Sequence, residues 1–137
     1  MEARSSKARV LFVDDDARIT QMAEQALRSQ GFDVLALTRP NDALAAFRAD
    51  PAGFDVVVLD HTMPGLSGLD LAAHISSARR DLPIVLLSGL AESLSQSALD
   101  RAGIRECLPK PLPLSQMAEV VQALLASDRK IFGPHSL

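Results

Sequence analysis

The chain has 137 residues, 47% of them apolar and 23% charged, which is the size and composition of one globular domain. Its 14 basic and 17 acidic residues give a formal net charge of −3 and form no basic block, so direct nucleic-acid binding is disfavoured. A single cysteine excludes an internal disulfide, and no apolar run approaches the roughly 18 residues of a membrane span, so we expect a cytoplasmic protein.

Short apolar segments alternate with segments of helical period along the whole chain. The first predicted helix starts at an aspartate cluster and ends at Gly31, and the later helices also stop at glycine or proline. This alternation predicts one α/β domain with a flavodoxin-like, doubly wound parallel sheet of order 2-1-3-4-5 and five helices. The predicted strands are 9–13, 33–37, 55–59, 84–87 and 105–108, and the predicted helices are 17–30, 41–48, 68–78, 92–102 and 114–126.

The predicted domain covers residues 9–127. Residues 1–8 are interpreted as an N-terminal extension and residues 128–137 as a C-terminal tail. Because the roughly 11 residues after Ala126 are too few to fold alone, we expect no separate output domain in this chain.

Polar side chains follow four of the predicted strands. Asp14 and Asp15 follow the first strand, Asp60 the third, Ser88 the fourth and Lys110 the fifth. The carboxyl ends of parallel strands meet at one edge of the sheet, so these side chains are expected to converge. Carboxylates about 6 Å apart repel by about 2–3 kcal/mol per pair at an effective dielectric constant of about 20, so they need a cation. A set of oxygen ligands with room for water and phosphate favours Mg²⁺.

With a magnesium ion bound, this edge would attract a phosphoryl group, and Asp60 would be a nucleophile that needs no general base. Lys110 would neutralise charge on the transferring oxygens. Taken alone, Ser88 would be interpreted as a turn hydroxyl and Lys110 as a solvated surface charge. Because both follow strand ends at the same edge as the carboxylates, a role in the phosphoryl-transfer site is favoured. Asp16 is expected to cap the first helix. His61 should point to the opposite side of its strand from Asp60, so it is not expected to be a ligand.

Four motifs resemble the response-regulator receiver family of two-component signalling, and they extend over nearly the whole chain. The stretch after the third strand is the most specific of them when it is combined with the upstream acidic pair and the downstream Lys-Pro. The motifs are Val13-Asp14-Asp15-Asp16, Leu59-Asp60-His61-Thr62-Met63-Pro64-Gly65, Leu87-Ser88-Gly89 and Leu108-Pro109-Lys110-Pro111.

This resemblance implies a role for each matching residue. Asp60 would be the phosphoacceptor, and Asp15, Asp60 and the backbone carbonyl of Thr62 would bind magnesium. Asp14 would act largely through water. A cis peptide bond before Pro111 would aim Lys110 into the site, and Ser88 would be the switch hydroxyl that moves to the phosphoryl group.

The sequence departs from the family pattern on the fifth strand. Receivers usually carry an aromatic residue there that turns inward when the switch hydroxyl moves, and Cys107 stands in its place. The usual aromatic readout is therefore in doubt, and a structural thiol is favoured over a redox sensor. Thr62 and Leu90 lie beside the expected path of the hydrolytic water, and we expect the apolar Leu90 to slow spontaneous dephosphorylation.

The resemblance implies a signalling domain that takes phosphate from a histidine kinase or a histidine phosphotransfer protein, acting as an enzyme only on itself. The chain is either a free-standing regulator or the receiver of a hybrid sensor histidine kinase, since the Asp-His-Thr-Met-Pro-Gly stretch is similar to such receivers. A homodimer through the fourth helix, fifth strand and fifth helix is also possible.

Three alternatives compete with this interpretation. A phosphatase of the haloacid-dehalogenase type also uses an aspartate at a strand end, but it needs a second aspartate where this chain has Thr62. A flavodoxin-like cofactor binder needs a loop rich in Gly, Ser and Thr after the first strand, and this loop is rich in Asp. A pseudo-receiver that only binds partners is disfavoured because every side chain that the chemistry requires is present.

Overall fold

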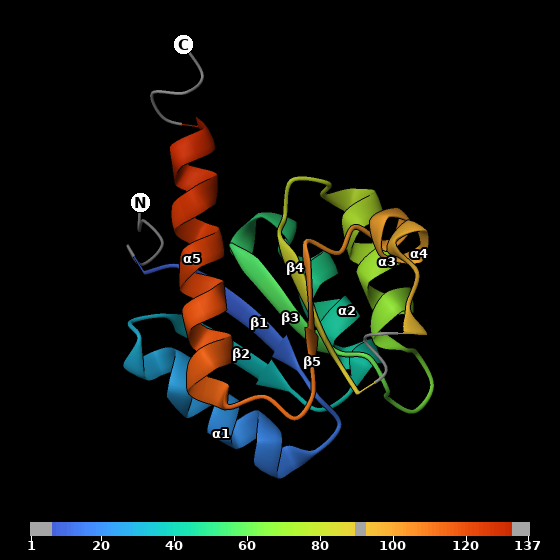
Figure 1. Ribbon diagram of the computed structural model, residues 1–137, viewed down its shortest axis with the longest axis horizontal. Helices are drawn as coiled ribbons and strands as arrows, with labels where there is room; N and C mark the ends of the chain where they lie inside the picture. The colour runs from blue at the N-terminus through green and yellow to red at the C-terminus, as the bar shows by residue number, and fades with distance from the viewer. Residues whose placement is uncertain (1–6, 90–92, 133–137) are drawn as a thin grey trace.

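The strands form one parallel sheet in the order β2-β1-β3-β4-β5, which confirms the predicted topology (Figure 1). The computed structural model describes residues 7–89 and 93–132. Strands β3 and β4 are buried along their whole length, because helices cover them on both faces. The strands are β1 Arg9–Val13, β2 Asp33–Leu37, β3 Val56–Asp60, β4 Ile84–Ser88 and β5 Glu106–Pro109.

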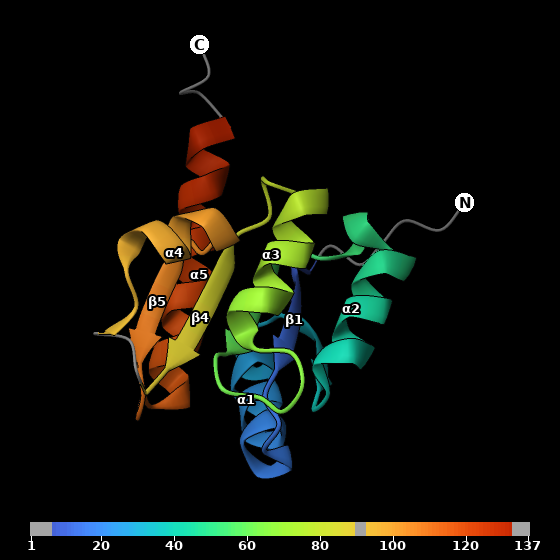
Figure 2. The same cartoon turned by 90° about the vertical axis from the view of Figure 1, so that its right-hand side faces the viewer.

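Helices cover both faces of the sheet (Figures 1 and 2). The α-helices of the described residues are α1 Ala17–Ser29, α2 Pro40–Ala49, α3 Gly68–Ala78, α4 Gln96–Ala102 and α5 Leu114–Phe132, with a 3-10 turn at Pro51–Gly53. Helices α1 and α5 pack on one face through a cluster that contains Phe12, Leu27 and Met117. Helices α2, α3 and α4 pack on the other face through a second cluster that contains Phe47 and Ile75. The sheet is therefore held between two separate apolar layers.

Two helix boundaries differ by more than one residue from those predicted from the sequence. Helix α4 begins at Gln96 instead of 92, because the Ser95 hydroxyl accepts the backbone N–H of Ala98 and caps the helix there. Helix α5 continues to Phe132, beyond the predicted end at 126. The chain offers no helix breaker after Leu114 until Gly133-Pro134, so the helical pattern has no reason to stop earlier.

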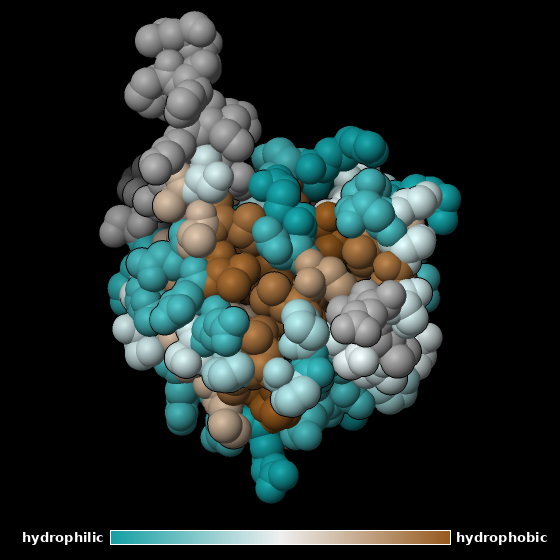
Figure 3. Space-filling model, in the orientation of Figure 1, coloured by the Kyte–Doolittle hydropathy of each residue, from teal (hydrophilic) through white to brown (hydrophobic). Residues whose placement is uncertain are grey.

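Apolar surface gathers in the region between α5 and the α3–α4 pair, over β5 and β4 (Figure 3). Strand β5 is an edge strand, and its central residues Cys107 and Leu108 are only half-buried. None of the described helices combines the length and the apolar character needed to cross a membrane.

Gly68, the first residue of α3, is packed tightly against the end of β3. A Cβ at this position would collide with the carbonyl oxygen of Asp60 and would approach Leu86 Cδ1 at 2.8 Å. We therefore expect Gly68→Ala to lower the free energy of unfolding by about 1–3 kcal/mol in urea denaturation, because a crowded core has to shift. Gly89→Ala is the matched control: a Cβ at Gly89 meets no atom of the described residues within 4 Å, and a change within about 0.5 kcal/mol is expected. Equal losses in both variants would contradict the crowding argument.

Candidate functional site

The structure brings Asp14, Asp15 and Asp60 together at the carboxyl edge of the sheet. One carboxylate oxygen from each lies within 4.8 Å of the others. Asp14 is 1% exposed and Asp60 is 5% exposed, whereas Asp15 is exposed. The cluster therefore has a buried floor of two carboxylates and an open side at Asp15.

Asp14 is oriented by its own chain segment. Its Oδ1 accepts the backbone N–H of Asp16 at 2.9 Å, and its carbonyl accepts the Thr20 hydroxyl at 2.8 Å. Asp16 caps α1 by accepting the backbone N–H groups of Arg18 and Ile19, as predicted. The positioning role of Thr20 was missed in the sequence. The sequence cue for this role is a threonine four residues after the capping residue Asp16. The Thr20 hydroxyl also donates to the carbonyl of Asp16.

Lys110 places its ammonium group between the two buried carboxylates. Its Nζ lies 2.8 Å from Asp60 Oδ1 and 3.5 Å from Asp14 Oδ2. The backbone of Lys110 donates to the carbonyl of Ser88 at 3.0 Å, and the Lys110–Pro111 peptide bond is cis, as the resemblance implies. Burial lowers the pKa of the Lys110 ammonium, but the hydrogen bond to Asp60 and the charge of Asp14 outweigh it, so this pKa is raised. Lys110 is therefore protonated at neutral pH.

The environment of Asp14 suits a cation. Burial raises the pKa of its carboxyl group, and the charge of Asp60 adds to this rise, while the N–H of Asp16 opposes it. The buried Oδ2 of Asp14 accepts no hydrogen bond from the described residues, although Lys110 lies nearby. A buried acceptor without a donor costs about 1–3 kcal/mol. A divalent cation held by oxygen ligands would remove that cost, and this donor set fits magnesium.

The other predicted residues fall into two groups. Ser88, at the end of β4, is 1% exposed, so it lies at the same edge as the carboxylates. Thr62 lies in the exposed loop after β3, and the role of its carbonyl stays a prediction. Leu90 lies outside the described residues, so its expected effect on dephosphorylation also stays a prediction.

His61 and Cys107 are not part of the carboxylate cluster. Among the described residues, the group that could hold a metal ion consists of aspartates and includes no histidine. The Nδ1 atom of His61 is buried and has no hydrogen-bond partner among the described residues. Cys107 packs against the apolar cluster under α3 and α4, and burial raises its thiol pKa. A raised pKa disfavours the reactive thiolate, which agrees with a structural thiol.

A parallel sheet of this order, with acidic side chains after β1 and β3 and a lysine after β5, is the architecture of a phosphorelay receiver. Residues 10–122 match the family model for the response regulator receiver domain, and the chain belongs to that family. Members of this family are signalling domains, so the family match favours the receiver interpretation over the phosphatase and flavin-binding alternatives.

Relatives and solved structures agree with this assignment. The chain is 35% identical over 119 residues to the response regulator MprA of Mycolicibacterium vanbaalenii, with 85% of this chain and 50% of that protein covered. It is 32% identical over 124 residues to the DNA-binding transcriptional regulator NtrC of Rhizobium meliloti, covering 90% of this chain and 25% of that protein. The chain thus spans half or less of these two relatives.

Among solved structures, a receiver domain from Clostridium thermocellum has a TM-score of 0.81 at 24% identity, covering 91% of this chain and 99% of that one. This likeness shows the fold alone. The response regulator TrrA of Thermotoga maritima, solved in complex with Mg²⁺ and BeF, has a TM-score of 0.75 at 28% identity, covering 85% of this chain and 98% of that one.

The burial of the Asp14 carboxylate leads to a prediction about stability. Asp14→Asn keeps an oxygen for the N–H of Asp16 but removes a buried charge, so we expect the magnesium-free protein to become more stable by about 1 kcal/mol, or roughly 3 °C in melting temperature. The same variant should lose the stabilisation that added magnesium gives the wild type. Asp16→Asn, at an exposed cap position, is the control and should leave both melting curves unchanged. A less stable Asp14→Asn would show that the carboxylate is not strained.

Proposed function

We propose that this domain accepts a phosphoryl group on Asp60 from a histidine kinase or a histidine phosphotransfer protein, with a magnesium ion bound at the carboxylate cluster. The observation that carries this proposal is the Lys110–Asp60 ion pair of 2.8 Å, set beside Asp14 and Asp15. TrrA, a relative of similar fold, was solved with magnesium and a fluoroberyllate group, which supports such a site in this chain.

The side chains divide the work of the transfer between them. Lys110 binds Oδ1 of Asp60 in the resting site, and a carboxylate oxygen of Asp60 attacks phosphorus. A new O–P bond forms as the P–N bond of the donor phosphohistidine breaks, and the imidazole leaves with the bond's electron pair. Lys110 stays protonated and compensates charge on the phosphoryl oxygens. The bound metal would supply further positive charge to the same oxygens. Asp14 and Asp15 would hold it together with Asp60.

The conformational response to phosphorylation is proposed to differ in this chain from that of receivers with an aromatic residue on the fifth strand. Ser88, buried at the end of β4, is the hydroxyl that we propose moves toward the phosphoryl group. Cys107 offers a small half-buried side chain instead of a ring, so the response of β5 is proposed to be smaller than in receivers with an aromatic residue. Water later hydrolyses the acyl phosphate in this proposal, and the domain returns to its resting state.

We propose two settings in which this domain could act. Both a free-standing regulator and the receiver of a hybrid histidine kinase fit a chain that spans only 25% of NtrC and 50% of MprA. The homodimer suggested by the family resemblance stays a prediction. A measurement of the molar mass in solution would test it. The apolar surface over β5 and α5 is the face it would use (Figure 3).

The phosphoacceptor proposal is tested by intact mass after incubation with magnesium and acetyl phosphate. We expect an adduct of roughly 80 Da in the wild type, its loss in Asp60→Asn, and at least about tenfold slower formation in Lys110→Ala. Asp50→Asn, which changes an exposed aspartate at the end of α2, should label like the wild type. An adduct that persists in Asp60→Asn, or no adduct in the wild type, would overturn the proposal and leave the pseudo-receiver.

A phosphodonor protein has to dock beside Lys110 to bring its phosphohistidine to Asp60. A hollow of about 290 Å³ lies there between α1 and the segment that joins β5 to α5. Its walls are mainly apolar: Ile19 and Met22 of α1 face Pro111 and Leu114 across it, and Lys110 forms part of the wall. Met22 is 55% exposed, and it is the only exposed large apolar side chain of the described residues. We propose that the donor protein fills this hollow with an apolar side chain.

This docking proposal separates protein donors from small ones. Met22→Glu should slow phosphotransfer from the cognate kinase or phosphotransfer protein at least about tenfold, because a charge in the hollow has to be desolvated. Labelling by acetyl phosphate should be unchanged, since that donor needs no docking surface. Gln25→Glu adds the same charge to the exposed side of α1 outside the hollow and should transfer normally. Equal slowing with both donors would point to damage at Asp60 instead.

A further inference from the structure

Three arginines surround a second hollow at the other end of the molecule. Arg80 follows α3, Arg101 lies in the last turn of α4, and Arg105 precedes β5. All three line one hollow of about 260 Å³, with Asp100 and Ser76 also in its wall. The lining therefore includes three arginines from separate segments of the fold and one aspartate, and Arg101 also donates to the Ser97 hydroxyl at 3.2 Å.

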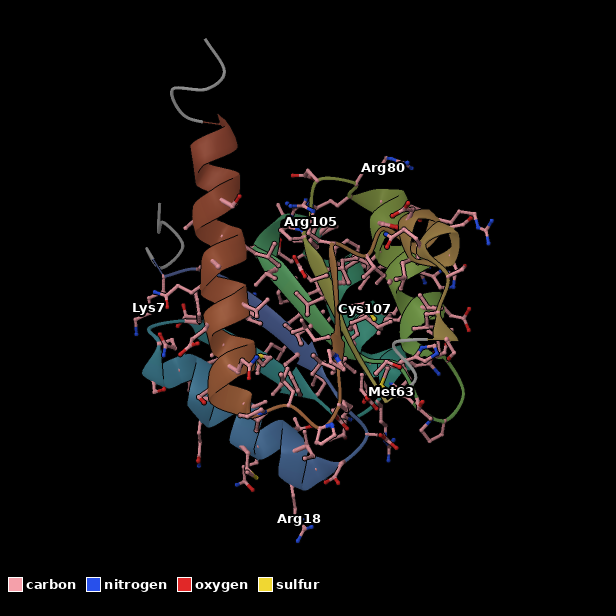
Figure 4. The ribbon with its side chains drawn as sticks, in the orientation of Figure 1. Lys7, Arg18, Met63, Arg80, Arg105 and Cys107 are labelled. Atoms are coloured by element: carbon pink, nitrogen blue, oxygen red, sulfur yellow. The ribbon has the colours of Figure 1, made fainter. Side chains whose placement is uncertain are left out.

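This hollow is distinct from the phosphoacceptor site. Figure 4 shows Arg80 and Arg105 at the upper end of the molecule, whereas Met63, in the loop that follows β3, lies toward the lower end. Arg105 immediately precedes β5, while Lys110 follows it, so the two sites lie at opposite edges of the sheet. A ligand held by the arginines would therefore not contact Asp60 or its magnesium site.

The arginines are not needed to cap the helix that ends there. Basic side chains near a helix C-terminus often serve its free carbonyl groups. At the end of α4, however, the carbonyls of Leu99 and Asp100 accept backbone N–H groups of Ile104 and Gly103. The carbonyl of Ala102 accepts the Ser76 hydroxyl at 3.0 Å. The main acceptors at this helix end are thus already satisfied without a guanidinium group.

Arg80 differs in this respect from its neighbour Arg79. Arg79 donates to the carbonyls of Pro51 and Phe54 and pairs with Asp81, so it has a structural role. Arg80 forms no hydrogen bond or ion pair with the part of the chain that the structure describes, and its side chain is exposed. Asp100, the one carboxylate in the wall, accepts the Gln96 amide at 2.8 Å. The hollow is therefore lined by at least one guanidinium group, that of Arg80, whose donors no described residue uses.

We infer that this hollow binds the phosphate groups of a small anionic ligand, with Arg80 and Arg105 as its principal contacts. Guanidinium groups bind phosphate through two parallel N–H···O bonds, which a lone surface charge does not provide. A volume of 260 Å³ is below the roughly 300–1,000 Å³ of pockets that enclose a drug-sized ligand. It suits a diphosphate group, and an attached nucleoside would lie outside the hollow.

The inference is tested by calorimetric titration of the whole chain with inorganic pyrophosphate and, in a separate arm, with ADP. A chelator keeps magnesium away, and constant ionic strength keeps screening equal. We expect one site with a dissociation constant below about 1 mM, weakened at least about tenfold in the double variant Arg80→Ala, Arg105→Ala. Arg48→Ala, at an exposed arginine of α2 outside the hollow, is the matched control and should bind like the wild type. Asp60→Asn should also bind normally.

Amide chemical shifts provide a readout that does not depend on the variants. Pyrophosphate should move the signals of Gly103 and Ile104, and not that of Gly89 near the phosphoacceptor edge. Equal affinities in the two arms would assign the site to phosphate chemistry alone, and tighter ADP binding would assign it to a nucleotide. The inference is overturned if neither ligand binds or if the arginine variants bind unchanged.

Discussion

An unbalanced set of charges at the carboxyl edge of the sheet is the feature on which the function of this domain depends. Asp14 and Asp60 are buried there beside Asp15, and among the described residues Lys110 is the one ammonium group that reaches them. Carboxylate oxygens within 4.8 Å of one another repel by at least about 3 kcal/mol per pair at an effective dielectric constant of about 20. One lysine cannot neutralise three carboxylates, so the resting site is left ready for a divalent cation and then for a phosphoryl group.

The rest of the fold supplies the stability that this cluster lacks. Strands β3 and β4 are buried throughout, and each fully buried Val or Leu contributes about 1.5–3 kcal/mol. Local hydrogen bonds from Asp16 and Thr20 then hold Asp14 in place, so the carboxylates cannot move apart. Strained charge thus persists at one edge because an apolar sheet and its two helical layers hold the strand ends together.

The sequence predicted the sheet and most of the site because both depend on local patterns. Apolar runs mark β3 and β4, and Asp14, Asp60 and Lys110 each lie at or directly after the end of a strand, so topology alone brings them together. The features that were missed depend on contacts between distant segments. The hollow beside Met22 needs α1 to face the β5–α5 connection, and Arg80 meets Arg105 only after α3 and α4 have packed. No periodicity in the chain reports such encounters.

Helix α4 lies in the chain between Ser88 and the arginine hollow. It has only seven residues, and its segment begins soon after Ser88 and ends at the arginine hollow, where Asp100 and Arg101 form part of the wall. Coupling between distant sites requires an element with two arrangements that both sites bias. The buried strands are poorly suited to this role, because close packing resists displacement. A short helix such as α4 is better suited to such a role. Any influence of the arginine hollow on phosphorylation would therefore pass through α4.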